Sequence, residues 1–191
     1  QSLQLDASRP APHPVFTSTT TLLQAGLRPR QPMKAPPALF TYGSIDPAAR
    51  PARHITLVWP DSAARWTWSN GSWLREQGEH SYSLTADTLT DGTQISATNV
   101  VIMAVDIAST GLHDVLGNPS PLDVTVGSNP AWVLRDGHLI RGTWHRKTIG
   151  DEISLTDSTG TPIALGPGRT WVGLLRRPGK RERAELDITI E

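Results

Sequence analysis

The chain has 191 residues, of which 37% are hydrophobic and 19% are charged, a composition typical of a folded globular domain and not of a disordered chain. Its 18 basic residues balance its 18 acidic residues, so no net charge attracts nucleic acid, and we expect no nucleic-acid partner. No apolar run reaches about 18 residues, so no segment of this chain is expected to span a membrane. The absence of cysteine excludes disulfides, thiolate metal ligands and cysteine nucleophiles.

Residues 1–53 are predicted to form an irregular, proline-rich N-terminal arm. Nine prolines lie between Ser8 and Pro51, and each removes a backbone donor from any regular element. One interval, residues 18–27, predicts a short helix. The residues expected to cap it, dock it and end it are Thr17 or Ser18, Leu22 and Leu23, and Gly26.

From residue 54 onward the pattern changes to short β-rich runs separated by turn residues. We therefore predict a mainly β fold, an antiparallel sandwich or barrel-like domain of about nine short strands over residues 54–176. The predicted strands are 54–59, 64–69, 72–77, 100–107, 122–126, 131–135, 138–146, 152–156 and 170–175. Residues 177–191 are predicted to form a charged C-terminal tail.

The dipeptide Asn70-Gly71 predicts a two-residue hairpin turn, because both residues tolerate the positive φ angles of a type I′ turn. This turn fixes the register, with Trp68 opposite Trp73. One face of the hairpin then carries three indoles and a guanidinium, from Trp66, Trp68, Trp73 and Arg75.

A second turn signal, Asp136-Gly137, joins residues 131–135 to residues 138–146. It predicts that Leu134 pairs with Leu139 and that Val133 pairs with Ile140. Both faces of this hairpin are partly apolar, so we expect it to be covered on two sides.

Three blocks of the β region follow one another in a recognisable order. The first is the 66–75 hairpin with Gly78-Glu79-His80 and the strand Asn99-Val100-Val101-Ile102. The second runs from Gly127-Ser128 through the 136–137 turn to Gly142-Thr143-Trp144-His145-Arg146, and the third ends on Gly168-Arg169-Thr170-Trp171-Val172. Together they resemble the C-terminal part of the YerB-like bacterial lipoproteins, a family of unknown function.

Upstream, the stretch 9–18 with Pro12-His13 resembles the last motif of that family's N-terminal domain, although Pro14 and Phe16 replace the usual asparagine and tyrosine. The resemblance implies a location outside the cytoplasmic membrane and an upstream lipid anchor. Because the chain opens at Gln1 without a start methionine, leader or lipid-attachment cysteine, we expect it to be part of a longer protein.

The indole face is the feature most suited to binding. If exposed, it offers flat apolar platforms and a fork of donors for a sugar ring or for an aromatic side chain of a partner. If buried, it is the core of the first hairpin, and the sequence leaves both alternatives open. The candidate ligand-binding residues are Trp66, Trp68, Trp73, Arg75, His13 and His80, the two histidines because they lie in the family-like motifs.

No catalytic pattern stands out. His113 and Asp114 are adjacent, but the sequence contains no nucleophile-elbow motif that could complete a catalytic triad with them. The six histidines show no metal-ligand spacing, so we expect neither a metal ion nor a cofactor. We predict a non-catalytic module that binds cell-wall polymer or another envelope protein. Two alternatives remain: part of a cell-envelope hydrolase whose site is shared with a preceding N-terminal domain, and a structural scaffold.

Overall fold

The computed structural model describes residues 3–8, 15–26, 39–44, 49–59 and 62–177, together with the backbone of residues 186–187. The chain divides into two units, residues 1–37 and residues 38–191. In the described part of the chain, no helix is both long enough and apolar enough to cross a membrane.

The first unit pairs β1 (Gln4–Leu5) with β2 (Val15–Phe16) and continues into the helix α1 (Thr19–Gly26). Ser18 caps the helix, because its hydroxyl accepts a hydrogen bond of 3.0 Å from the Thr21 N–H. Leu22 and Leu23, which were predicted to dock the helix, are 50% and 47% exposed, and no residue of the helix is buried. A two-residue ladder and a helix of two turns present no apolar layer large enough to cover these side chains.

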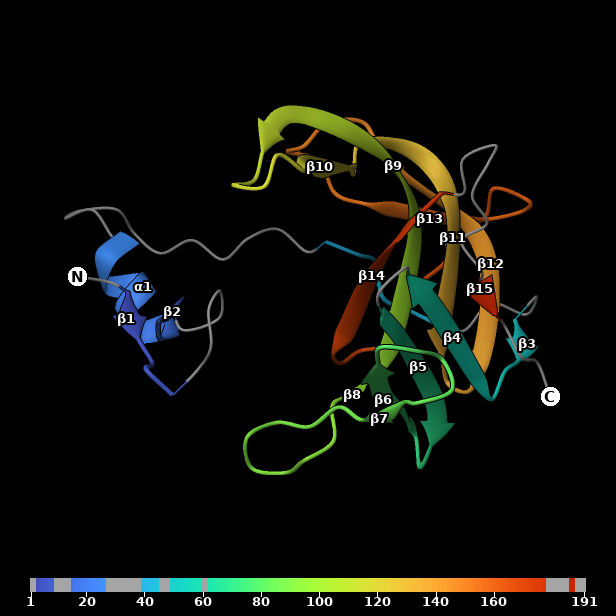
Figure 1. Ribbon diagram of the computed structural model, residues 1–191. Helices are drawn as coiled ribbons and strands as arrows, with labels where there is room; N and C mark the ends of the chain where they lie inside the picture. Colours follow the sequence, from blue (N-terminus) through green and yellow to red (C-terminus); the bar gives the residue numbers. More distant parts are fainter. Residues whose placement is uncertain are drawn as a thin grey trace. The chain divides into compact units, whose positions relative to one another are not determined.

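The second unit contains two sheets (Figure 1). In the larger sheet, the order is β10-β9-β11-β12-β13, with β14 beside β9 and β3 beside β12. β9 is the longest strand of this sheet and curves along its whole length in Figure 1. The bounds are β3 (Arg50–Pro51), β9 (Asn99–His113), β10 (Pro119–Val124), β11 (Gly127–Arg135), β12 (His138–Arg146), β13 (Ser154–Asp157) and β14 (Thr170–Arg176).

The smaller sheet has the order β15-β4-β5-β6-β7, and β8 also pairs with β6. Its bounds are β4 (His54–Trp59), β5 (Ser62–Ser69), β6 (Ser72–Gly78), β7 (Thr85–Ala86), β8 (Ser96–Ala97) and β15 (Leu186–Asp187). β15 adds antiparallel to the outer edge of β4. All nine predicted strands are present, and the described part of the chain adds six strands of two residues each.

The mainly β fold is confirmed, with one difference in strand direction. All pairs between named strands run antiparallel in the described residues except one, in which β14 lies parallel to β9. β14 is reached from β13 through a long connection, which leaves its direction free, whereas a tight hairpin forces antiparallel pairing.

Both predicted hairpin turns are confirmed. Asn70 and Gly71 have φ angles of 49° and 80°, and Trp68 pairs with Trp73 while Trp66 pairs with Arg75. In the second hairpin Asp136 and Gly137 have φ angles of 49° and 71°, and both predicted pairs, 134 with 139 and 133 with 140, are present.

The two faces of the larger sheet bury separate apolar clusters. One cluster lies between the two sheets and contains Trp66 and Trp73 from the smaller sheet with Ile102 and Leu134 from the larger one. The other lies on the opposite face and contains Val133, Ile140 and Trp144, closed over by Phe40, Ile163 and Leu165. The second hairpin is therefore covered on both faces, as its sequence predicted.

Candidate functional site

The structure places the indoles of the first hairpin largely in the core. Trp66 is 1% exposed and Trp73 is fully buried. Trp68 lies at the rim of this core, with its ring centroid 5.2 Å from that of Trp73. The sequence left open whether the indole face is exposed or buried, and in the structure Trp66 and Trp73 are buried. A direct ligand contact by these rings stays a prediction.

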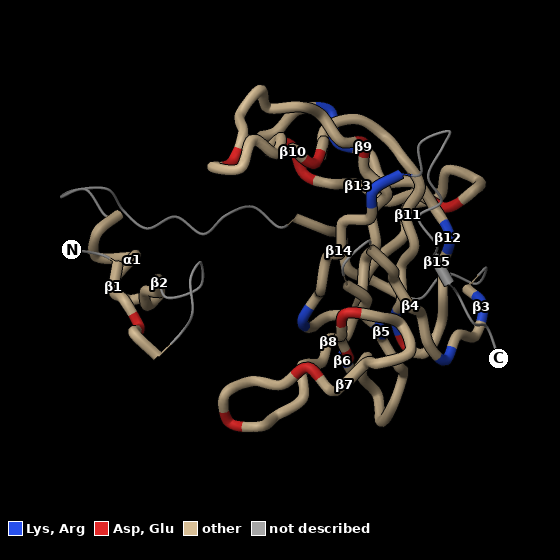
Figure 2. Tube along the Cα trace, viewed as in Figure 1, with Lys and Arg blue, Asp and Glu red and all other residues tan. Residues whose placement is uncertain are grey.

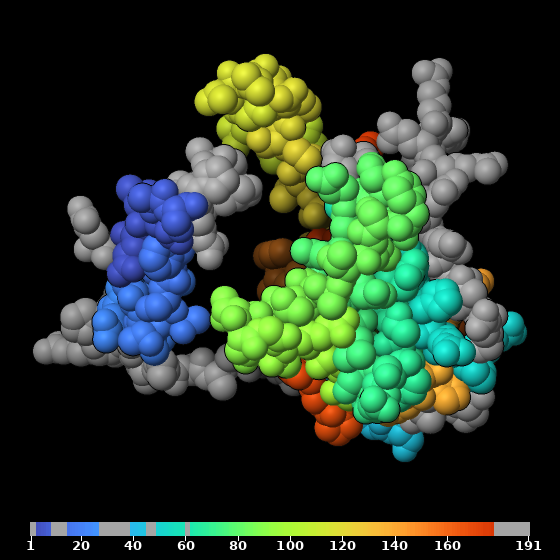
Figure 3. All heavy atoms as spheres, turned by 60° about the horizontal axis from the view of Figure 1, so that its bottom comes forward, coloured from blue at the N-terminus to red at the C-terminus, as the bar shows by residue number. Residues whose placement is uncertain are grey.

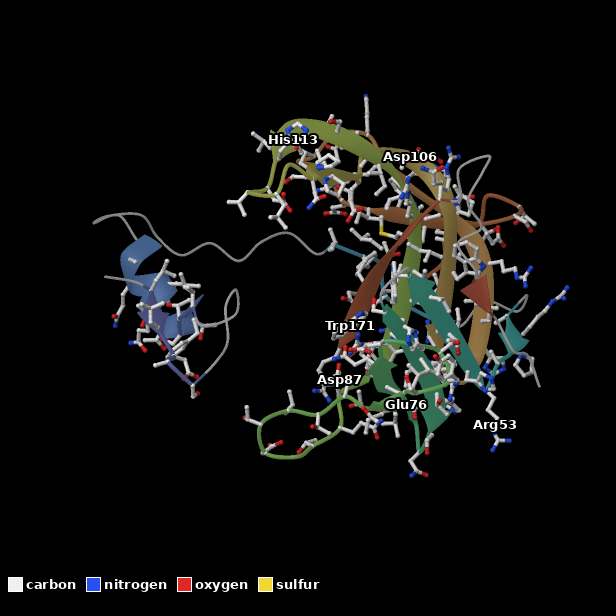
Figure 4. The ribbon with its side chains drawn as sticks, viewed as in Figure 1. Arg53, Glu76, Asp87, Asp106, His113 and Trp171 are labelled. Atoms are coloured by element: carbon white, nitrogen blue, oxygen red, sulfur yellow. The ribbon has the colours of Figure 1, made fainter. Side chains whose placement is uncertain are left out.

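Arg75 marks the point where this buried face reaches solvent. Its side chain is 13% exposed, and its Nη1 donates to the Asp87 carboxylate and, at 2.7 Å, to the Gln77 side-chain oxygen. The guanidinium carbon lies 4.8 Å from the centroid of the Trp171 ring, which itself lies 5.3 Å from the Trp66 ring. Burial lowers the pKa of the Arg75 guanidinium from its ordinary value. Asp87 and Trp171 are labelled near the lower end of β14 in Figure 4.

The backbone of Arg75 holds the loop that supplies Asp87. β7 pairs with β6 on one side of Arg75 and β8 pairs with it on the other. Between them, the Arg75 N–H donates to the Ile95 carbonyl at 2.9 Å, and the Arg75 carbonyl accepts the Asp87 N–H at 3.0 Å. Both ends of the 87–95 loop are therefore anchored on one residue, and the first end places a carboxylate beside the Arg75 side chain.

A hollow of about 380 Å³, here called the polar hollow, opens on one side of Arg75. Its wall combines one indole with charged, amide and hydroxyl groups. The Nε atom of Arg75 is buried and has no hydrogen-bond acceptor among the described atoms. The lining side chains with chemistry to offer are Trp59, Ser62, Arg75, Gln77, Glu79 and Thr85.

A second hollow of about 320 Å³, here called the apolar hollow, is lined by Trp171 at the start of β14 and by Leu89 and Ile95 of the 87–95 loop. Trp171 is 37% exposed, so one part of its ring is supported by Trp66 and Arg75 while another part is open. The remaining lining residues are Ser96, Ala97, Arg169 and Thr170.

Asn99 fixes the chain just before β14. Its amide nitrogen donates to the Gly166 carbonyl at 2.8 Å and to the Thr170 hydroxyl at 3.1 Å, and its amide oxygen accepts the Gly166 N–H at 2.8 Å. A buried side chain with these three bonds gives the turn before β14 one defined conformation. The position of Trp171 therefore depends on a residue of β9 about seventy positions earlier in the chain.

The remaining candidate residues do not join this cluster in the described structure. His80 is exposed and stacks on Tyr82 with ring centroids 5.0 Å apart. His13 lies outside the described residues. His113 lies far from Trp171, at the tip of β9 (Figure 4), and Asp114 accepts hydrogen bonds from Asn118 and from the Leu116 N–H. Within the described ranges, no group of three His, Asp or Glu side chains is placed to hold a metal ion.

Sequence reasoning missed Asp87 as the partner of Arg75, and it missed Trp171 and Trp59 as lining residues. The sequence did indicate that Arg75 needs a negatively charged partner, because a guanidinium is rarely buried without one. Trp171 stood in a quoted motif, but local sequence gives no sign that a strand near the C-terminus pairs with β9.

These features define an all-β domain of two packed sheets with a polar hollow lined by Arg75 and an apolar hollow lined by Trp171. The chain belongs to a family of proteins of unknown function: the model for the DUF3048 C-terminal domain matches residues 55–172. The crystal structure of the YerB protein from Bacillus subtilis is similar to it, with a TM-score of 0.64 and 14% sequence identity over 91% of this chain. The match covers 56% of the YerB chain. No curated protein matches the sequence.

Proposed function

We propose that this chain is a non-catalytic binding module that works outside the cytoplasmic membrane and holds a segment of cell-wall polymer in the polar hollow. The observation that carries the proposal is the wall of this hollow, where an indole, a carboxylate, an amide and a fixed guanidinium surround about 380 Å³. The extracytoplasmic location is supported by the resemblance to YerB-like lipoproteins.

The chemistry of the wall suits a sugar ring. Trp59 offers an apolar surface for the C–H face of a pyranose, while Gln77, Glu79 and Thr85 offer acceptors and donors for its hydroxyl groups. The volume falls within the range of roughly 300–1,000 Å³ that small-molecule sites occupy, and it suits one or two rings.

Arg75 adds a positive charge to the wall of the hollow. Asp87 and Gln77 hold the guanidinium in place, so binding requires little ordering of the side chain.

The same residues favour binding over hydrolysis. Glycoside hydrolysis normally needs two carboxylates flanking the scissile bond. Of the described residues that line the polar hollow, Glu79 alone carries a carboxylate. Asp87 lies nearby, but its carboxylate is engaged by Arg75.

Isothermal titration calorimetry with purified glycan strands and muropeptides tests the proposal. Glu79→Ala removes an ionised acceptor, and we expect the affinity to fall by about 10- to 100-fold, since hydrogen bonds to charged groups contribute about 1.5–3 kcal/mol. Glu152→Ala, at an exposed glutamate outside the hollow, is the matched control and should leave the affinity unchanged. If wild type binds neither ligand, or if both variants bind like wild type, the proposal is wrong.

A further inference from the structure

β14 has an edge with no strand beside it in the described part of the molecule. It pairs with β9 over seven residues, from Thr170 opposite Asn99 to Arg176 opposite Val105. In a parallel pair, alternate residues direct both backbone groups toward the partner strand. The hydrogen bonds at the two ends of β14 show which residues of β14 face β9. The Arg177 N–H donates to the Val105 carbonyl, and the Arg169 carbonyl accepts the Asn99 N–H.

Odd-numbered residues therefore bond to β9, and the even-numbered residues Thr170, Val172 and Leu174 direct their N–H and C=O groups away from it. These outward groups are here called the open edge. From Thr170 to Leu174 they repeat every two residues along about 13 Å of strand, at the spacing of a second extended backbone. Among the folded elements of proteins, a strand is the one that satisfies such a row of alternating donors and acceptors.

In the described structure, the outer edges of β10 and β4 are interrupted or partly paired. β10 carries Pro119 and Pro121 and a register shift between them, which are features that prevent further pairing. Along the outer edge of β4, β15 pairs with Thr56 and Leu57. β14 contains no proline and no lysine, and its pairing with β9 runs without a shift. An edge of this length with none of these protections is a template for a partner strand.

The apolar hollow lies at the first end of this edge. Paired residues of adjacent strands point to the same face of a sheet, so the residue of an added strand that lies opposite Trp171 shares the face of the Trp171 side chain. Its side chain would enter the space between Trp171, Leu89 and Ile95. The hollow therefore selects an apolar side chain at that position.

Positive charge at the first end of β14 favours an acidic neighbour. The sequence contains no aspartate or glutamate from residue 158 to residue 177, and Arg169 precedes the strand. Beyond the other end, Arg177 already pairs with Asp106 of β9 at 2.8 Å. Arg169 is exposed and donates to the Ser96 hydroxyl at 3.1 Å. Figure 2 shows acidic residues along the loop between β7 and β8, which supplies Leu89 and Ile95 to the apolar hollow.

We propose that β14 takes up an extended segment of a partner protein as an additional strand, with an apolar side chain in the apolar hollow and an acidic residue beside Arg169. This site is separate from the polar hollow and does not depend on saccharide binding. The partner's backbone would satisfy the open edge, which gives affinity, while the hollow and Arg169 give specificity.

A proline at residue 172 tests the backbone contact directly. The Val172 N–H faces away from β9, so Val172→Pro removes an outward donor and places a ring on the open edge without removing a bond to β9. Val172→Ala shortens the side chain and keeps the donor, which makes it the matched control. The probe is a library of acetylated decapeptides with acidic residues flanking four alternating apolar positions, measured by fluorescence polarisation.

We expect library members that bind wild type and the alanine variant alike, and that lose about tenfold or more in affinity for the proline variant. Arg169→Glu should weaken the same peptides and should not affect peptides in which lysine replaces the acidic residues. Amide hydrogen exchange gives a readout that needs no variant, because a bound peptide should slow exchange at residues 172 and 174 but not at 171 and 173, which already bond to β9. If no peptide in the library binds, if the proline variant binds normally, or if exchange at 172 and 174 is unchanged by a bound peptide, the proposal is wrong.

Discussion

Replacing Asp87 by alanine should destabilise the protein more than its position on a loop suggests. The Arg75 and Asp87 side chains are only 13% and 17% exposed, and Arg75 also lies against the Trp171 ring. With Asp87 gone, the guanidinium keeps Gln77 as an acceptor but loses its counter-charge, while its Nε still has no acceptor in the described structure. A half-buried cation without a counter-charge carries a large desolvation cost.

Removing one partner of a buried ion pair costs about 3–5 kcal/mol, and the remaining exposure of this pair lowers the expected cost to about 2–3 kcal/mol. For a chain of this size each kcal/mol lowers the thermal midpoint by roughly 2–4 °C, so Asp87→Ala should lower it by about 5–10 °C. The double variant Arg75→Met/Asp87→Ala removes the charge and keeps an apolar stem against Trp171. It should therefore be no less stable than Asp87→Ala alone.

Urea unfolding followed by tryptophan fluorescence measures these differences. Glu76→Ala, on the same strand as Arg75, is the matched control because it removes an ion pair that is more exposed to solvent. The Glu76 Oε2 atom lies 3.9 Å from the Arg65 Nη1 atom, and the two side chains are 29% and 35% exposed. That variant should cost less than about 1 kcal/mol. The reasoning is refuted if Asp87→Ala unfolds like Glu76→Ala, or if the double variant is less stable than Asp87→Ala alone.

Three further predictions follow from other contacts. Asn99→Ala removes two buried hydrogen bonds and one partly buried hydrogen bond before β14, and it should lower the free energy of unfolding by about 2–3 kcal/mol with faster amide exchange at Thr170. A loss of global stability without that local change would contradict it. Gly142→Ala places a Cβ against the Thr156 carbonyl and 2.6 Å from Ile163 Cδ1, so it should cost about 1–3 kcal/mol in urea unfolding, and a neutral result would show that β12 and β13 separate easily. Three loop aspartates have a pKa below the ordinary value because groups within their own loops donate hydrogen bonds to them. The stability that these bonds give the loops is therefore present above a pH of about 4 and is lost as the pH falls through the lowered pKa. Amide exchange measured by NMR should show these loops opening in acid before the sheets open, and simultaneous opening of loops and sheets would refute the prediction. The aspartates and the main donors are Asp91 with the Thr93 N–H, Asp114 with the Asn118 side chain, and Asp157 with the Thr159 hydroxyl.

The strands and turns could be predicted from the sequence because their causes are local. Alternating β-rich runs and the dipeptides at 70–71 and 136–137 fix strand position and register within a few residues. The pairing of β14 with β9 is not local, since Trp171 lies opposite Val100 across about seventy residues of chain. Such pairing depends on how the two sheets close over their shared core, and the pattern of neighbouring residues does not contain it.

The extension of β9 and β10 beyond the core is a second feature that local patterns only partly predicted. The strand predicted over 100–107 continues to His113, and Figure 3 shows this part of the chain as a projecting yellow lobe. Leu112, Val115 and Leu116 are 67%, 101% and 83% exposed there. An apolar residue in a β-rich run predicts a strand, but whether a second layer covers it depends on distant parts of the fold.

The candidate site follows from one requirement that the sequence did contain. Arg75 lies opposite Trp66 on a buried face, and a guanidinium in that position needs a carboxylate. Glu76 points to the other face of the sheet, and Glu79 lies past the end of β6, so a partner for Arg75 must return from the following loop. Asp87 does so through backbone bonds to Arg75 itself, and the same loop carries Leu89 and Ile95 to Trp171. The loop that neutralises Arg75 thus also supplies part of the wall of the apolar hollow.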